Sequence, residues 1–216
     1  MKALGYTFQN TALRDQALTH RSAGRRHNER LEFLGDGILN FVIAEALFRK
    51  FPDAPEGDLS RLRARLVRGE TLAKVATELD LGKALIMGSG EMKSGGQRRS
   101  SILADVVEAL LGAIYIDGGF APCRETILRL FAERLINLPP ADELKDPKTR
   151  LQEWLQGRGH PVPEYSLIDS WGEEHQRTFR CQCKVKPDPG PFYGEGRSRR
   201  KAEQLAAMAA LERLKK

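Results

Sequence analysis

The spacing of the apolar residues changes at a proline-containing segment, residues 137–147, and this change constrains the fold more than any other feature of the sequence. Before the segment, apolar residues recur every three or four positions, and one such series is Leu31, Leu34, Ile38 and Val42. This spacing is typical of amphipathic helices. The sequence therefore predicts that the part of the chain before the segment is all-α.

After the segment, extended patterns appear between helical ones. Residues 179–185 alternate strictly between apolar and polar side chains, which is typical of a half-buried strand. Further strands are predicted at residues 165–168 and near Phe192, and helices at residues 148–157 and 199–214. The predicted order is α-β-β-β-α, which makes this part an α+β domain.

Prolines define the boundary between the two parts. Pro139 and Pro140 stop the preceding helix and Pro147 opens the next one, because proline lacks the main-chain donor that a helix interior needs. We therefore predict three segments: an N-terminal domain over residues 1–138, a linker over residues 139–145 and a C-terminal domain over residues 146–216.

The composition restricts the class of protein. Of the 216 residues, 41% are hydrophobic and 30% are charged, as in globular proteins with a buried core. The most apolar stretch, residues 37–48, is too short to span a bilayer, so we expect no membrane segment. Three cysteines and an N-terminus unlike a secretory signal favour a cytoplasmic location. The net charge of +6 favours a polyanionic partner.

Three acidic residues share one face of a predicted helix in the N-terminal domain. Glu29, Glu32 and Asp36 lie at positions i, i+3 and i+7, within an arc of about 60° around a helix. Phe33 and Ile43 flank this stripe, where a solvent-facing helix would carry Lys or Arg. We therefore expect the stripe to be partly buried.

A second acidic pair, Asp105 and Glu108, lies one helical turn apart, with the small residues Ala109 and Gly112 on the same face. Two helices with partly buried carboxylates resemble the metal sites of helix bundles, because like charges share a pocket only at high cost without a cation. Oxygen ligands without His or Cys favour Mg²⁺ or Mn²⁺ over Zn²⁺. Spacing alone leaves an alternative open, in which these acids only complement helix dipoles and form salt bridges.

The run NERLEFLGD, residues 28–36, resembles the signature of bacterial ribonuclease III. Other stretches that resemble this family follow in the expected order, at residues 18–22, 56–60, 85–91 and 102–115. Residues 146–216 look like a double-stranded-RNA-binding domain, with KTRLQE at its start and SRRKAEQ at the beginning of its last helix.

This resemblance implies a Mg²⁺-dependent endoribonuclease, with Mn²⁺ as a substitute ion, that makes staggered cuts in double-stranded RNA and leaves 5′-phosphate and 3′-hydroxyl ends. It also implies that the substrates are ribosomal RNA precursors and other structured transcripts, and that a homodimer cuts both strands. The implied metal-binding acids are Glu32, Asp36, Asp105 and Glu108. Among them, Asp36 and Glu108 are assigned the catalytic role.

Three further residues are candidates near this site. The resemblance implies that Glu29 and Glu56 assist close to the scissile bond, and the role of Glu56 rests on the resemblance alone. Phe33, an apolar residue beside the acidic stripe, is our candidate for a contact with the partner subunit. An ordinary core phenylalanine is the alternative for this position.

The C-terminal domain carries polar and basic groups suited to duplex RNA, which proteins read through its shape, its 2′-hydroxyls and its phosphates. Three polar residues share one face of the first predicted helix, namely Thr149, Gln152 and Glu153. His175 lies between the first two strands. Three cations begin the last helix, where the helix dipole disfavours them without an anionic ligand: Arg199, Arg200 and Lys201.

Two other functions stay open from the sequence. A non-catalytic binder of double-stranded RNA would need none of the acids, all of which are present, and a nuclease acting mainly on DNA is disfavoured by the C-terminal domain. His20 and His27 lack an acid or nucleophile at a recognisable triad spacing, and we assign them no chemistry. A basic stripe either follows a phosphate backbone or is a plain exposed helix face; it consists of Arg61, Arg65 and Arg68.

Overall fold

The computed structural model describes residues 4–215, with the side chains of residues 141, 142, 174 and 189 excepted. The chain divides into two compact units, Met1–Ala141 and Asp142–Lys216. This division falls inside the predicted linker, residues 139–145, whose bounds stay a prediction. None of the described helices is long and apolar enough to cross a membrane.

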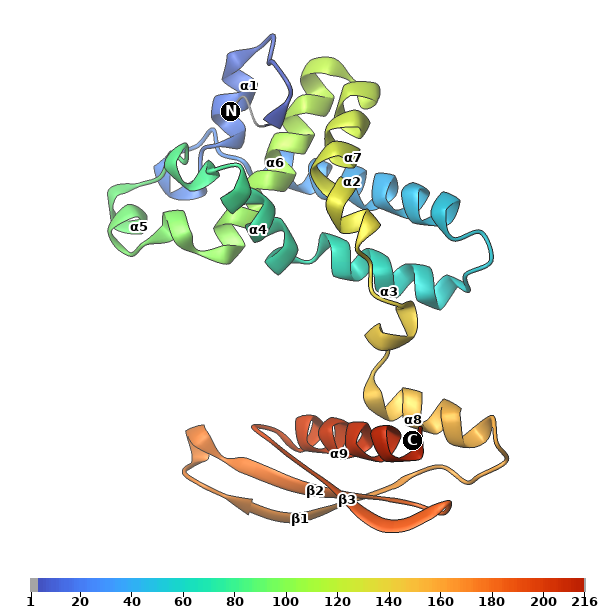
Figure 1. The fold of residues 1–216 in the computed structure, drawn as a ribbon. Coiled ribbons are helices and arrows are strands. Elements are labelled where there is room, and N and C mark those ends of the chain that lie inside the picture. Colours follow the sequence, from blue (N-terminus) through green and yellow to red (C-terminus); the bar gives the residue numbers. More distant parts are fainter. Residues whose placement is uncertain (1–3, 216) are drawn as a thin grey trace. The chain divides into compact units, whose positions relative to one another are not determined.

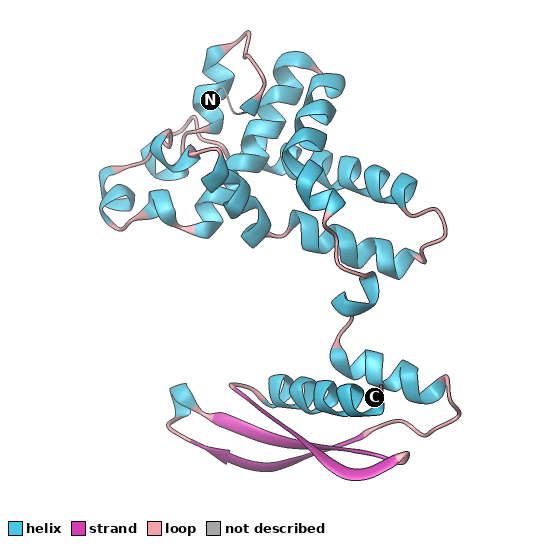
Figure 2. Cartoon of the chain, in the orientation of Figure 1, coloured by secondary structure: helices cyan, strands magenta, loops and turns pink. Residues whose placement is uncertain are grey.

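The described part of the first unit is helical, as predicted (Figures 1 and 2). Its α-helices are α1 (Thr11–Ala17), α2 (Glu29–Lys50), α3 (Glu56–Val67), α4 (Gly69–Glu78), α5 (Ser89–Lys93), α6 (Ser100–Gly118) and α7 (Phe120–Ile136). Short 3₁₀ helices lie between them: η2 (Arg21–Ala23), η3 (Leu81–Lys83) and η4 (Gly96–Arg98). Helix η5 (Ala141–Leu144) spans the division between the two units along the chain.

Helix α6 forms the centre of the first unit (Figure 1). It packs against α1, α2, α4 and α7, and its apolar residues from Ile102 to Ile114 are buried. A helix that is apolar on most sides is stable in water only when neighbours cover it. Helix α2 covers one side of α6 with a stripe of buried residues that includes Leu31, Leu39 and Val42.

The segment between α1 and α2 is fixed against the segment before α5. The main chains of Leu18 and His20 exchange hydrogen bonds with Ile86, at 2.9 and 2.8 Å. The hydroxyl of Ser22 accepts a hydrogen bond from the backbone N–H of Gly88 at 2.9 Å. A further bond, from the Asn28 N–H to the Thr19 carbonyl at 2.9 Å, holds the same segment beside the beginning of α2.

The second unit has the predicted α-β-β-β-α order (Figure 2). Its elements are α8 (Pro147–Gln156), β1 (Glu164–Trp171), η6 (Glu174–Gln176), β2 (Thr178–Val185), β3 (Asp188–Gly196) and α9 (Arg199–Leu214). The strands form an antiparallel sheet in the order β1-β2-β3. Strands β1 and β3 extend beyond the residues predicted for them, because pairing with β2 continues past their apolar centres.

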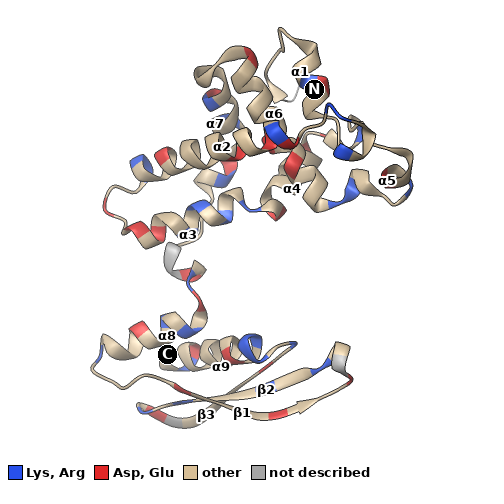
Figure 3. Cartoon of the chain, turned by 180° about the vertical axis from the view of Figure 1, so that it is seen from behind, with Lys and Arg blue, Asp and Glu red and all other residues tan. Residues whose placement is uncertain are grey.

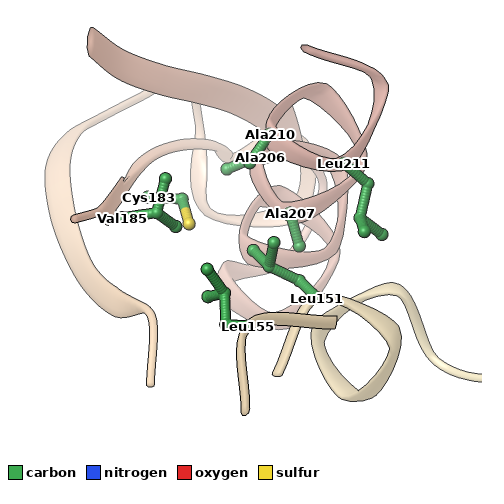
Figure 4. Packing of buried hydrophobic residues seen from close by; sticks show 8 residues of the cluster. All are labelled: Leu151, Leu155, Cys183, Val185, Ala206, Ala207, Ala210 and Leu211. Carbon is green, nitrogen blue, oxygen red and sulfur yellow. The ribbon is translucent and has the colours of Figure 1, made fainter. Parts of the chain in front are cut away.

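One face of this sheet packs against the two helices (Figure 4). Cys183 and Val185 of β2 contact Leu151 and Leu155 of α8 and an alanine-rich face of α9. Cys181 and Cys183 are buried and unbridged, so both are small residues of the core. Helix α9 lies so close to β3 that a Cβ atom at Gly194 would stand 2.2 Å from the Ala202 carbonyl oxygen.

Candidate active site

Two glycines let α2 and α6 cross at backbone contact. A Cβ atom at Gly35 would lie 1.8 Å from the carbonyl oxygen of Glu108, and one at Gly112 would lie 2.2 Å from the carbonyl oxygen of Leu31. Side chains of any size at these two positions would push the helices apart. The close crossing brings together acids that are about 70 positions apart in the sequence.

Glu32 from α2 and Asp105 and Glu108 from α6 form what we call the acid cluster. One carboxylate oxygen from each lies within 4.8 Å of the others. All three side chains are partly buried. Figure 3 shows acidic positions of the two helices meeting where the helices cross. The partial burial that the sequence predicted for the acidic stripe is confirmed for Glu32 and is wrong for Glu29 and Asp36, which are exposed because only Glu32 faces α6 at the crossing.

The carboxylates of the acid cluster repel one another. Burial, followed by the charges of Asp36, Glu32 and Asp105, raises the pKa of Glu108 to about 8. Burial and neighbouring acids also raise the pKa of Glu32, and burial raises the pKa of Asp105. A divalent cation would relieve this repulsion, and an all-oxygen donor set suits Mg²⁺ or Mn²⁺. The residues present therefore fit such an ion.

Asp36 lies one turn after Glu32 on α2. Its charge acts on both Glu32 and Glu108. The side-chain N–H of Asn40 donates to Asp36 Oδ1 at 2.7 Å, which orients this carboxylate. Asp36 is exposed and is not one of the three residues whose oxygens already converge. Its part in metal binding stays a prediction.

A pocket of about 410 Å³ opens beside the cluster. Glu29, Glu32 and Asp105 line it, so the structure places the predicted auxiliary acid Glu29 at the site. Its other lining residues include donors and cations: His20, Arg21, Asn28, Arg99 and Ser101. The pocket is therefore lined by both acids and hydrogen-bond donors.

The hydrogen-bond donors of this pocket were not predicted from the sequence. The sequence gives no chemistry to His20, yet this residue lines the pocket, where it opposes the rise that burial causes in the pKa of Asp105. Arg21 approaches Glu29 at 3.5 Å, and Arg99 pairs with Glu91 at 2.9 Å. The stretches at residues 18–22 and 28–36 contained the signal, but spacing along the chain does not show that they meet.

Glu56 lies elsewhere in this chain. It begins α3 and accepts a hydrogen bond from the Ser60 hydroxyl at 2.6 Å. It lines a second depression, of about 400 Å³, together with Phe41 and Phe48. Within one chain, the structure does not bring Glu56 to the acid cluster.

Phe33 projects from α2 into solvent with 83% of its surface exposed. The alternative of an ordinary core phenylalanine is therefore wrong. Aromatic residues are enriched at protein interfaces, so this exposure is compatible with the predicted contact. Its contact with a partner subunit stays a prediction.

The predicted RNA-binding residues of the second unit lie at its surface. Thr149, Gln152 and Glu153 are exposed on α8, and His175 is exposed in η6 between β1 and β2. Exposed cations occupy the first turn of α9 (Figure 3): Arg199, Arg200 and Lys201.

Several of these residues already have protein partners. Glu153 pairs with Lys145 at 2.7 Å, and Arg200 lies 3.5 Å from Asp146. Arg199 donates to the buried Glu203 at 3.0 Å. Arg199 therefore has a structural partner that the sequence analysis did not anticipate.

Comparisons with known proteins cover both units. Residues 10–135 match the family model described as Ribonuclease-III-like, and residues 147–214 match the double-stranded RNA binding motif. The chain is 61% identical over 211 residues to Ribonuclease 3 of Alkalilimnicola ehrlichii, with 98% of this chain and 92% of that protein covered. It is 56% identical to Ribonuclease 3 of Vibrio cholerae, with 98% and 94% covered.

Solved structures similar to this chain include nuclease domains of ribonuclease III. The nuclease domain of ribonuclease III from Campylobacter jejuni is 42% identical with a TM-score of 0.61, covering 64% of this chain and 95% of that domain. A second structure of that domain is 44% identical with a TM-score of 0.60, covering 61% and 93%, and its description concerns a region involved in dimer formation.

Proposed function

Because the chain belongs to the ribonuclease III family, we propose that it cuts double-stranded RNA at the acid cluster, with Mg²⁺ held by Glu32, Asp36, Asp105 and Glu108. It is an endoribonuclease that acts on double-stranded RNA. The observation that carries the assignment of the site is the convergence of three partly buried carboxylates within 4.8 Å.

The chemistry needs an activated water and charge neutralisation on the phosphoryl oxygens, both of which a bound divalent cation supplies. The protein provides the ligand oxygens and holds them in place through the glycine crossing of α2 and α6. Burial and the neighbouring acids raise the pKa of Glu108, and a bound cation would lower it again, so Glu108 would hold the ion as a charged carboxylate. We propose that the products carry 5′-phosphate and 3′-hydroxyl ends.

The second unit supplies affinity for the duplex. A-form RNA exposes 2′-hydroxyls in a shallow minor groove and phosphates across the major groove. The exposed polar face of α8 and the exposed His175 suit minor-groove contacts, and the cationic first turn of α9 suits phosphates. We propose these contacts for Thr149, Gln152, Glu153, His175, Arg199, Arg200 and Lys201.

A homodimer explains two features that one chain leaves unused. Phe33 projects near the start of α2, and the depression lined by Phe41, Phe48 and Glu56 lies near its end. In a two-fold dimer, Phe33 of each subunit can contact the depression of the other subunit, so that the contact forms twice. If Phe33 fills the partner's depression, the partner's Glu56 comes close to Glu32. This arrangement accounts for the auxiliary role of Glu56 and for staggered cuts in both strands.

The test is cleavage of a long end-labelled RNA duplex by the wild type, by Glu108→Gln and by the control Glu125→Gln, which alters an exposed acid of α7. We expect short products from the wild type and the control with Mg²⁺, and none from Glu108→Gln or in EDTA. Tight binding without cleavage under all conditions would instead indicate a non-catalytic RNA-binding protein.

A matched DNA duplex in the same assay tests the alternative of a DNA nuclease, and we expect it to stay intact. We propose that the substrates in the cell are ribosomal RNA precursors and other structured transcripts. We also propose that the protein acts in the cytoplasm. Mn²⁺ should replace Mg²⁺, because both ions accept octahedral oxygen ligands.

A further inference from the structure

Asn28 occupies the N-cap position of α2 without capping the helix. Asparagine is among the best capping residues, and Asn10 shows the usual behaviour, since its side chain accepts from the Ala12 N–H at the start of α1. The side chain of Asn28 makes no such bond. Its main chain is nevertheless fixed, because its N–H donates to Thr19 at 2.9 Å and its carbonyl accepts from Leu31 and Glu32.

The side-chain amide of Asn28 is a buried donor without a partner. The residue is 2% exposed, and Nδ2 has no hydrogen-bond partner among residues 4–215. Buried polar groups in proteins almost always have a partner, and an unpaired one lowers stability. Asn28 lines the pocket beside the acid cluster. A ligand that enters this pocket can therefore supply the missing acceptor.

The neighbours of Asn28 indicate what kind of ligand this is. An N–H group needs an acceptor oxygen, and two arginines that also pair with acids, Arg21 and Arg99, line the same pocket. Asn28 lies one turn before Glu32, so its amide and the metal-binding carboxylate reach the same bound group. A neutral amide can hold a phosphate oxygen without repelling the cation nearby, whereas a lysine in its place would compete with the cation.

We propose that Nδ2 of Asn28 donates a hydrogen bond to a non-bridging phosphate oxygen of the RNA strand at the acid cluster and so orients the phosphodiester for the cut. This inference rests on the function proposed above. A cation held by the acid cluster would neutralise charge on the phosphate, and a hydrogen bond from a rigidly held amide would fix the direction of one of its oxygens.

The test uses the full chain and a short RNA duplex with a single phosphorothioate, Rp or Sp, at the scissile position, with Mn²⁺ as the ion. Asn28→Ala removes the donor, and Asn28→Leu removes it while keeping the volume filled. Both variants should lower kcat on the normal duplex by about 100-fold, as loss of a transition-state donor does, with little change in KM.

Sulfur at the oxygen that Asn28 contacts should slow the wild type but add no further loss in Asn28→Ala. The other diastereomer should have equal effects on both proteins. Equal sulfur effects in wild type and variant for both diastereomers would overturn the proposal. Cleavage by the wild type tests the proposed function, which fails if the wild type does not cut the duplex. If the wild type cuts and Asn28→Ala is fully active, only the role given to Asn28 is overturned.

Two measurements without RNA test whether the Asn28 side chain instead serves ion binding or the stability of the fold. Mn²⁺ binding, followed by electron paramagnetic resonance, should be unchanged in Asn28→Ala, and a weaker affinity would overturn the proposal by assigning the amide to the ion's water shell. Thermal unfolding should show a lower Tm for the capping variant Asn10→Ala and no such loss for Asn28→Leu. A Tm loss in Asn28→Leu as large as in Asn10→Ala would show a structural role and overturn the proposal.

Discussion

Gly35 of α2 lies against the main chain of Glu108 of α6, so closely that a Cβ atom at Gly35 would stand 1.8 Å from the Glu108 carbonyl oxygen. The same contact sets the distance between the carboxylates of Glu32 and Glu108. Packing of the helix pair and geometry of the acid cluster therefore depend on one glycine.

Gly35→Ala should separate the two helices and impair the site. We expect a loss of about 1–3 kcal/mol in the free energy of unfolding, as for other overpacked cores, and at least about a tenfold loss in Mn²⁺ affinity. Urea unfolding and metal titration of the purified variant measure the two effects.

Gly37→Ala is the matched control, because Gly37 is exposed on the same helix and a Cβ atom there meets nothing within 4 Å. The free energy of unfolding of Gly37→Ala should rise by about 1 kcal/mol, which is the difference in helix propensity between alanine and glycine. Equal behaviour of the two variants would contradict the role given to the crossing.

The folding stability of the metal-free protein should depend on the proton of Glu108. Its pKa is about 8 in the folded chain and about 4.3 in an unfolded one. Between these values the folded state holds a proton that the unfolded state has lost, so the free energy of unfolding decreases as the pH rises from about 4 to about 8.

Glu108→Gln removes this dependence. In EDTA the variant should match the wild type near pH 4 and exceed its stability at pH 8 by on the order of 1–2 kcal/mol, a figure reduced for the partial exposure of the carboxylate. Addition of Mg²⁺ should stabilise only the wild type. Urea unfolding across this pH range provides the measurement, and parallel curves for both proteins would refute the prediction.

Phe33→Ala should weaken the dimer without unfolding the monomer. Because 83% of Phe33 is exposed, its loss leaves the core of one chain intact. An aromatic anchor of an interface contributes about 2 kcal/mol or more, so the dimer dissociation constant should rise about 30-fold or more. Sedimentation equilibrium measures this, with Ile136→Ala, an exposed apolar residue at the end of α7, as the control.

Glu203 ties the two helices of the second unit together. Its carboxylate accepts from Lys148 of α8 at 2.6 Å and from Arg199 at 3.0 Å, and these contacts lower its pKa despite the opposing effect of burial. Its contribution to stability is present above the unfolded pKa, about 4.3, and is lost as the pH falls through the lower folded value.

Glu203→Gln should destabilise the unit by about 3 kcal/mol at pH 7, because two cations lose a buried partner. It should also weaken RNA binding, since Arg199 and α8 lose their alignment. Loss of the negative charge alone would strengthen RNA binding, whereas loss of alignment would weaken it. Filter binding at several salt concentrations shows which of these two effects is larger.

Arg200→Ala should weaken binding to all duplex sequences alike. A lost phosphate contact lowers the slope of log affinity against log salt by about 1. Arg213→Ala removes an exposed arginine from the last turn of the same helix and should leave the slope unchanged. An unaltered slope in Arg200→Ala would exclude Arg200 from the interface.

The sequence by itself determined that the first unit is helical, the order of helices and strands in the second unit, and the helix faces on which the acids lie. Apolar periodicity is a local property, because each residue's position around a helix or along a strand follows from its neighbours in the chain. For this reason the all-α unit, the α-β-β-β-α unit and the stripe of Glu29, Glu32 and Asp36 could all be predicted.

Only the tertiary structure decided which side chains meet. The approach of α2 and α6 at Gly35 and Gly112 selects Glu32, Asp105 and Glu108 for the acid cluster. Long-range packing also brings Asn28 and Arg99 into one pocket and leaves Glu56 at a distance within the chain. Spacing along one helix contains no information about the crossing of two, because that crossing depends on contacts between residues far apart in the sequence.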